Sequence, residues 1–459
     1  MPSPPKAELP PFGHDPFADL DRAAVARALT QLADRAGDVA DAFFERSEEV
    51  ELPPEDRPPG VRVRREEGLA VRLLRAGSGG AHGCETWMAA RDALSGEAFA
   101  EALRQAARVM PAATSPQPPI APPPWPGAAE APEVLAFPAA VHRAVRARRS
   151  AFPVALTVRR HRRWVQVVGG GKVVPEPQAE GFYSVAAELP WGRWGALFPR
   201  LGEAEAERVA AALVERFRGR EAPPPEPFRG ALVLAPAAAA VLLHEAVAHA
   251  LEADLLALGG DPEAAVGVRF GSPLLNVLDD PAAAPEPVRR TSDDEGNGVR
   301  RRWLLRGGVV AEPLADARWA ARSDVLAPGA GRRAGRHASP SPRSAFLELV
   351  PGELDDEALL AGADGGLHLA EAEGGDLDPL TGTFRLRFAG GRRIREGAPA
   401  EAVGPCRLVG RVAELLEAVA GVGRRAEPGG AGWCAKDGHK LPVWASCPAL
   451  RLDGVEVVP

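Results

Sequence analysis

The stretch "VLLHEAVAHALEAD" at residues 241–254 ends a long apolar run and brings together two histidines and three carboxylates. It follows "RGALVLAP" at 229–236, which is typical of a buried strand that ends at a proline. The uncharged run at 231–243 is too short to span a bilayer and contains a proline. The pattern therefore predicts a strand followed by an apolar helix at the start of the C-terminal half.

Within this stretch the polar residues have a spacing that permits two interpretations. A zinc-protease helix separates its histidines by four positions, which places them within about 40° on one face. His244 and His249 are five positions apart, or about 140° on a regular helix, so both face one metal only if the helix is distorted, as by a π-type bulge. The alternative is a core helix with both histidines satisfied at its ends and with Glu245, Glu252 and Asp254 on its solvent face.

A catalytic zinc needs three protein ligands and an open position, and the third ligand is typically a thiolate or an imidazole. The segment "AGWCAKDGHKLPVWASCPALRLDG" at 431–454 offers Cys434, Cys447 and His439. The plainer interpretation of each is a buried thiol or a surface imidazole. The residues alone leave these alternatives open.

The composition indicates an ordinary globular protein. The chain of 459 residues is 46% hydrophobic and 25% charged, with a net charge of -7, which does not favour a nucleic-acid partner. The basic segments at 142–150 and 159–166 are expected on a solvated face. Four scattered cysteines do not form a disulfide framework, and the first 20 residues lack the apolar core of a signal peptide, so we expect a cytoplasmic protein without a membrane partner.

The order of predicted elements gives the fold class. Two proline-rich stretches, at 111–132 and 221–228, interrupt the pattern, and the second separates a finished helix from a fresh strand. We predict an α+β fold, in which an N-terminal α/β-type domain at 1–227 precedes a mainly β C-terminal domain at 228–459 that carries the metal-binding helix. Helices are expected at 20–37, 95–110, 202–219 and 410–423, and strands at 38–52, 68–87, 152–174, 180–189, 301–310, 346–352, 366–375, 381–394 and 448–458.

Several motifs in this order resemble the TldD/PmbA family of zinc-dependent peptidases, also described as modulators of DNA gyrase. They are "LLHEAVAHALEAD", "RRTSDDEGNGVRRRWLLRGGVV", "GRRAGRHASPSPRSAFLELVPGE", "GGLHLAEAEGGDLDPLTGTFRLRFAGGRRI" and "WCAKDGHKLPV", followed by "PALRL". Together they cover most of residues 228–453. The N-terminal segments at 39–52 and 68–87 resemble the family more loosely.

The resemblance implies that His244, His249 and Cys434 bind Zn²⁺ and that Glu245 is the general base for a zinc-activated water. It also implies a peptide or unfolded-protein substrate, and a homodimer or a heterodimer with a related subunit. Two residues depart from the family pattern: Ala248 stands where glycine is usual, and His439 where glutamine is usual. His439 is a candidate fourth ligand, a substrate contact or a surface residue. Because alanine is less adaptable than glycine, a catalytically silent partner subunit is the alternative function. A gyrase or nucleic-acid modulator is a third hypothesis, which the negative net charge disfavours.

Overall fold

The computed structural model describes residues 17, 19–33, 38–54, 60–76, 84–106, 131–148, 150, 152–169, 177–190 and 192–459. Residues 107–130 of the chain, which include nearly all of the proline-rich stretch expected at 111–132, lie outside this part. Within the described residues no helix is both long enough and apolar enough to cross a membrane.

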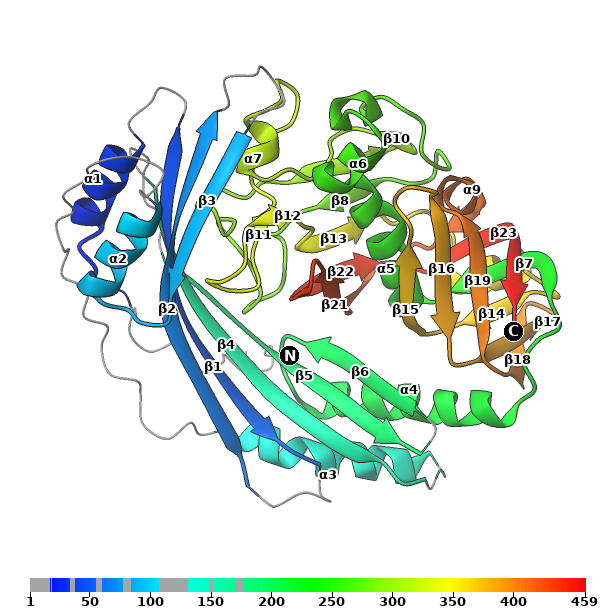
Figure 1. Ribbon diagram of the computed structural model, residues 1–459. Coiled ribbons are helices and arrows are strands. Elements are labelled where there is room, and N and C mark those ends of the chain that lie inside the picture. The colour runs from blue at the N-terminus through cyan, green and yellow to red at the C-terminus, as the bar shows by residue number, and fades with distance from the viewer. Residues whose placement is uncertain are drawn as a thin grey trace, which may run out of the picture.

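The N-terminal half forms one antiparallel sheet of six strands with helices on its outer side (Figure 1). Its strand order is β3-β2-β1-β4-β5-β6. The strands are β1 (Val39–Leu52), β2 (Arg62–Ala76), β3 (Cys84–Arg91), β4 (Ala155–Gly169), β5 (Gln178–Leu189) and β6 (Gly192–Phe198), and the helices are α1 (Arg22–Leu32), α2 (Gly96–Ala106), α3 (Pro132–Ala147) and α4 (Glu203–Glu221).

Both faces of this sheet are covered, as alternate residues of β1 show. Phe44 packs on the helix side, where its ring stacks on Phe99 of α2 with centroids 6.3 Å apart. Its neighbour Phe43 points to the opposite face, where the guanidinium of Arg333 from the C-terminal half lies 4.4 Å from its ring centroid. Side chains of a strand alternate between the two faces of a sheet. One face of this sheet therefore packs against the helices, and the other packs against the C-terminal half.

The C-terminal half contains two further large sheets with one apolar helix between them (Figure 1). Their strand orders are β10-β9-β8-β13-β22-β21 and β15-β16-β19-β23-β7-β14-β17-β18, and β20 pairs with β23 in the second. Helix α5 (Pro236–Leu243) shares a continuous core with both sheets, which explains why its sequence is apolar all round. This burial fixes the position of the histidines that follow α5.

The remaining C-terminal elements complete these layers. They are β7 (Phe228–Leu234), α6 (Ala253–Gly259), β8 (Val277–Asp279), β9 (Arg302–Arg306), β10 (Val309–Val310), α7 (Ala317–Ala320), β11 (Gly331–Arg332), β12 (Ser341–Pro342), β13 (Phe346–Leu349), α8 (Asp356–Ala361), β14 (Leu367–Leu369), β15 (Ala372–Leu377), β16 (Thr383–Phe388), β17 (Gly391–Arg395), β18 (Ala398–Val403), β19 (Cys406–Arg411), α9 (Val412–Glu417), β20 (Val419–Val422), β21 (Glu427–Lys436), β22 (His439–Cys447) and β23 (Leu450–Val458).

The α+β class and the mainly β C-terminal half are confirmed, while several local predictions differ. The helix expected at 410–423 ends at Glu417, because Val419–Val422 pairs with β23 as a strand. The elements that were not predicted include helix α3 and strands β6, β8, β18, β19, β21 and β22. The expectation of a solvated face at 159–166 is wrong for part of β4, since Arg160 is 3% exposed and pairs with Glu48. The domain boundary expected between residues 227 and 228 falls in the connection from α4 to β7.

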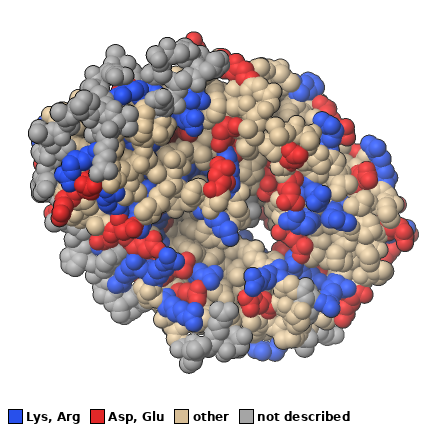
Figure 2. Space-filling view, in the orientation of Figure 1, with Lys and Arg blue, Asp and Glu red and all other residues tan. Residues whose placement is uncertain are grey.

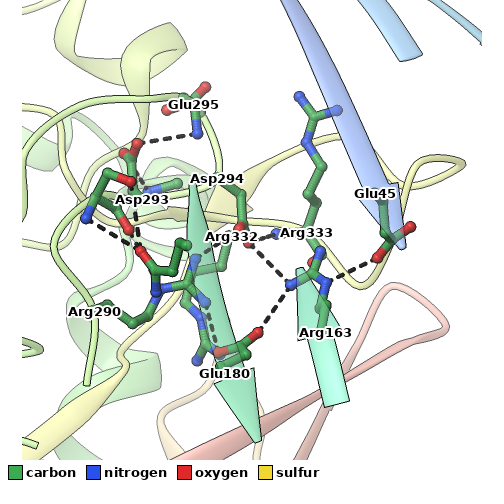
Figure 3. Close-up of polar contacts among 12 residues, drawn as sticks. Glu45, Arg163, Glu180, Arg290, Asp293, Asp294, Glu295, Arg332 and Arg333 are labelled. Carbon is green, nitrogen blue, oxygen red and sulfur yellow. Dashed lines mark hydrogen bonds and ion pairs between the residues drawn. The ribbon is translucent and has the colours of Figure 1, made fainter. Parts of the chain in front are cut away.

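Buried ion pairs join the inner face of the N-terminal sheet to a loop of the C-terminal half (Figure 3). Arg163 Nε donates to Glu45 at 2.8 Å, and Arg163 Nη1 donates to Glu180 at 3.2 Å. From the C-terminal half, Arg290 donates to Glu180 at 3.0 Å and to Asp294 at 2.6 Å. Breaking one partner of such a buried pair leaves an uncompensated charge, so these contacts make the two halves interdependent.

Candidate metal centre

The chain after α5 is irregular where the histidine spacing requires it. Residues His244–Ala248 form a π-helical turn, and His249–Leu251 a short 3₁₀ turn. The backbone N–H of His249 donates to the carbonyl of His244, five residues earlier, which is the hydrogen bond of a π turn. This wider turn brings the two imidazoles to one side, with ring centroids 4.7 Å apart. The distortion expected from the five-residue spacing is therefore present.

Ala248 adopts this turn without the backbone freedom of glycine. Its φ of -62° and ψ of -55° are ordinary helical values, and its side chain is fully buried in the core. A residue with a Cβ atom is thus accommodated at the position where the resemblance to the TldD/PmbA family predicts glycine.

Three side chains meet in a group that could hold a metal ion. The ligand atoms of His244, His249 and Cys434 all lie within 4.8 Å of one another, and all three residues are buried. Cys434 Sγ lies 3.2 Å from Nε2 of His249. The Nε2 atom of His244 is buried and has no hydrogen-bond partner among the described residues. A buried nitrogen without a partner is costly unless something binds it, so the group fits a metal ion.

Cys434 lies on β21, and the pairing of β21 with β22 places its side chain beside the two histidines. Cys447 lies on β22, where it is fully buried in the hydrophobic core and burial raises the pKa of its thiol to about 12. His439 lies exposed at the turn of the same hairpin. Neither residue belongs to the three-residue group found among the described residues, so of the three candidates for the third ligand only Cys434 has the required position.

The surroundings favour a thiolate at Cys434. Burial alone would raise the pKa of this thiol, but the charge of His244, together with the charge and hydrogen bond of His249, lowers it to about 5. The Cys434 carbonyl also accepts a hydrogen bond of 2.8 Å from Arg343. A thiolate is the form of cysteine that binds metals.

Each histidine is contacted through Nδ1, on the side away from the group. His249 Nδ1 lies 3.0 Å from a carboxylate oxygen of Glu252, and His244 Nδ1 lies 3.4 Å from the hydroxyl of Ser344. Contacts at Nδ1 orient an imidazole so that Nε2 is left for a metal. Glu252 is 0% exposed, which contradicts the interpretation that placed it on the solvent face of a plain core helix.

Glu252 is itself held by a lysine from the hairpin. Lys436 Nζ lies 2.8 Å from Glu252 Oε2, 2.8 Å from Asp254 Oδ1 and 3.2 Å from the carbonyl of Pro342. Burial would raise the pKa of Glu252, but the charges of His249 and Lys436 lower it to about 2. Glu252 is therefore an ionised carboxylate beside His249.

Glu245 lies at the open side of the group. Its carboxylate is 3.9 Å from His249 Nε2, and its side chain is 19% exposed. Burial raises the pKa of Glu245, while the two histidines oppose that shift. The facing strand β15 has Gly375 at the point of contact, where any Cβ atom would lie 2.7 Å from Glu245 Cγ. This close approach leaves space only for glycine.

Residues 229–459 match the family model described as the PmbA/TldA metallopeptidase C-terminal domain. The matched segment contains the whole three-residue group and slightly more than half of the chain. This chain belongs to the TldD/PmbA family.

Relatives with curated names are similar over about half of this chain. A metalloprotease of Methanothermobacter thermautotrophicus is 32% identical over 234 residues, which are 50% of this chain and 51% of that protein. A protein of Haemophilus influenzae described as a metalloprotease TldD homolog is 29% identical over 219 residues, which are 47% of this chain and 45% of the relative. In these comparisons the chain spans about half the length of the relatives it matches.

The TldD/PmbA fold extends through the N-terminal half as well. The crystal structure of TldE from Thermococcus kodakarensis aligns with a TM-score of 0.70 at 17% sequence identity, over 95% of this chain and 100% of that one. At this identity the likeness concerns the fold alone. Because it covers 95% of this chain, the likeness includes the N-terminal half, where the sequence resemblance to the TldD/PmbA family is only loose.

Sequence reasoning missed four residues around this TldD/PmbA centre: Glu252, Lys436, Ser344 and Gly375. Glu252 had a usable signal, because a carboxylate three residues after a histidine can reach its ring. The others come from segments about 100 residues or more from the histidines, and no local pattern connects them.

Proposed function

We propose that this chain is a zinc-dependent peptidase in which Glu245 is the general base. The observation that carries the proposal is the meeting of two imidazoles and one buried thiol beside a partly open carboxylate. The metallopeptidase family domain and the names of the relatives support the same class. A mixed imidazole and thiolate donor set suits zinc better than the oxygen-preferring Mg²⁺ or Ca²⁺.

In this proposal each residue has one task. His244 and His249 would hold the metal ion through Nε2, and Cys434 would hold it through its thiolate. A zinc ion bound there would supply Lewis-acid chemistry for the activation of water and of the peptide carbonyl. Glu245 accepts the proton of the attacking water on its carboxylate and donates it to the leaving amine. Burial raises the pKa of Glu245, which suits a group that must both take and return a proton.

We further propose unfolded or leader-type peptides as substrates, and a homodimer or a heterodimer with a related TldD/PmbA-type subunit. Cys406, Cys434 and Cys447 are free thiols, which agrees with a cytoplasmic location. The alternative of a silent subunit depended on Ala248, and the ordinary helical backbone of that residue supports the active type instead.

The test combines metal content with cleavage. The purified protein is expected to contain about one zinc per chain by elemental analysis and to cleave an unstructured peptide. A chelator should abolish cleavage, and added Zn²⁺ should restore it. Bound zinc without cleavage of any unstructured peptide, alone or with a related subunit, would support the silent subunit instead.

A further inference from the structure

A cavity of about 320 Å³ lies between the two halves of the molecule, where β6 faces α5, β15 and the β21–β22 hairpin. We call it the interdomain pocket. In the space-filling view the molecule is hollowed in this region (Figure 2). Its walls include Trp194, Phe198, Ala237, Val241, Phe346 and Trp444.

Helix α5 connects the pocket to the metal centre. Most of this helix is buried, but Ala237 is exposed and Val241 is half-buried, and both line the pocket. Glu245 follows Val241 by four residues and is the next partly exposed side chain on that face. Four helical residues rise about 6 Å, so the pocket begins about one turn from the proposed general base.

Strands β15 and β21 also extend from the pocket to the metal centre. On β15, Ala372 lines the pocket and Gly375 contacts Glu245. On β21, Gly432 lines the pocket and Cys434 belongs to the metal group. Three separate elements thus lead from the pocket to the centre within two to four residues. A peptide whose carbonyl lies beside Glu245 therefore has a neighbouring side chain within reach of the pocket.

The walls are suited to an apolar group. Four aromatic side chains come from both halves of the chain: Trp194 and Phe198 from β6, Phe346 from β13 and Trp444 from β22. The indole N–H of Trp194 already donates to Glu371 at 3.0 Å, and burial raises the pKa of that carboxyl. At the rim, Arg208 pairs with Glu205 at 2.9 Å. These polar groups have partners, and the other charged lining residues, Arg200, Glu286 and Glu427, are exposed to solvent. A ligand that enters beside the aromatic side chains therefore gains mainly by burying apolar surface.

We propose that the interdomain pocket binds a bulky apolar side chain of the peptide substrate, of the leucine or phenylalanine type, beside the bond that is cut. The proposal rests on the proposed peptidase function and adds a substrate preference to it. Because residues of both halves form the walls, this preference depends on the contact between the N-terminal sheet and the C-terminal domain.

The test uses zinc-loaded full-length protein and unstructured peptides that differ at one position next to the cleaved bond. Phenylalanine or leucine at that position is expected to raise kcat/KM about 10-fold or more over alanine, aspartate or lysine. Ala237→Trp places a large ring in the pocket, and it should lower the value for the phenylalanine peptide towards that for the alanine peptide. Ala358→Trp, at an exposed alanine of α8 outside the pocket, is the matched control and should keep the preference.

A wild-type enzyme without this preference, or an Ala237→Trp variant that keeps it, would overturn the pocket assignment. If no peptide is cleaved, the peptidase function fails, and calorimetric binding of the phenylalanine and alanine peptides then decides the pocket separately. Tighter binding of the phenylalanine peptide that is lost in Ala237→Trp supports the pocket, and equal binding overturns it.

Discussion

Glu252 Oε2 lies 3.0 Å from Nδ1 of His249, and both residues are buried. The contact joins a carboxylate just after the 3₁₀ turn to the second histidine of the metal group, and Lys436 balances the charge. Such a carboxylate fixes the orientation of the imidazole ring and makes Nε2 a stronger metal ligand. His249 is therefore oriented before any metal binds.

Replacing Glu252 should weaken metal binding. Glu252→Ala removes the acceptor for His249 and leaves Lys436 without one of its carboxylates, so we expect zinc affinity to fall about 10- to 100-fold. Glu252→Gln keeps an acceptor oxygen and should lose less. Competition with a chromophoric chelator measures both, with Glu357→Ala on exposed α8 as the control. Unchanged affinity in Glu252→Ala would contradict the role of this contact.

The change Glu245→Gln separates catalysis from metal binding. Glutamine has nearly the same shape but does not accept the proton, so we expect zinc content near the wild-type value and a loss of cleavage of at least about 100-fold. Elemental analysis and peptide cleavage on the same sample measure the two properties. Hydrolysis at the wild-type rate would show that Glu245 is not the base.

Cys434→Ser tests the third ligand. A serine hydroxyl replaces a thiol whose pKa is about 5, and it remains neutral at pH 7, so the variant should have lower zinc occupancy and proportionally lower cleavage. Cys447→Ser, on the paired strand, is the control for loss of a buried thiol, and its zinc content should persist in the folded fraction. Full zinc occupancy in Cys434→Ser would exclude Cys434 as a ligand.

Gly375 determines the space available to Glu245. A Cβ atom in Gly375→Ala would lie 2.7 Å from Glu245 Cγ, so the carboxylate must move. Displacement of a catalytic group by about 1 Å can cost about 100-fold in rate, and we expect a loss of 10- to 100-fold in kcat with zinc retained. Gly298→Ala, where no atom lies within 4 Å, is the control. Equal activities of the two variants would argue against close packing at Gly375.

Asp316 gives stability a measurable pH dependence. Burial and the nearby Glu295 raise the pKa of this carboxyl above its ordinary value. The folded protein then holds the proton more tightly than the unfolded chain, so the stabilising contribution is complete below about pH 4 and is lost as the pH rises towards the raised value. Asp316→Asn keeps an acceptor for the N–H of Trp319 and does not ionise.

The difference in the free energy of unfolding between Asp316→Asn and the wild type should therefore shift in favour of the variant from pH 4.5 to pH 8. The expected shift is on the order of 1–2 kcal/mol. Thermal unfolding at both pH values measures the difference. Asp355→Asn, which changes the matching N-terminal cap of the more exposed helix α8, is the control. If the stability difference between Asp316→Asn and the wild type does not change with pH, Asp316 is ionised equally in the folded and unfolded states.

Local sequence patterns predicted the structure correctly where a helix or strand is determined by its own residues. The apolar run before His244 predicted a buried helix, and the five-residue spacing predicted a distortion that the structure shows as a π turn. Alternation and glycine turns also predicted most strands. The prediction of a helix across 419–422 was wrong because pairing with β23, a long-range contact, overrides local helical spacing.

By itself, the sequence determined the α+β class, the helix that carries the histidines and the identity of the candidate ligands. The tertiary structure alone decided which thiol faces those histidines, since the pairing of β21 with β22 directs Cys434 to the group and leaves Cys447 in the core. It also decided that Glu252, Lys436, Ser344 and Gly375 surround the centre. The physical reason is that these contacts depend on strand register and domain packing, which bring together residues about 100 or more positions apart and leave no local periodic signal.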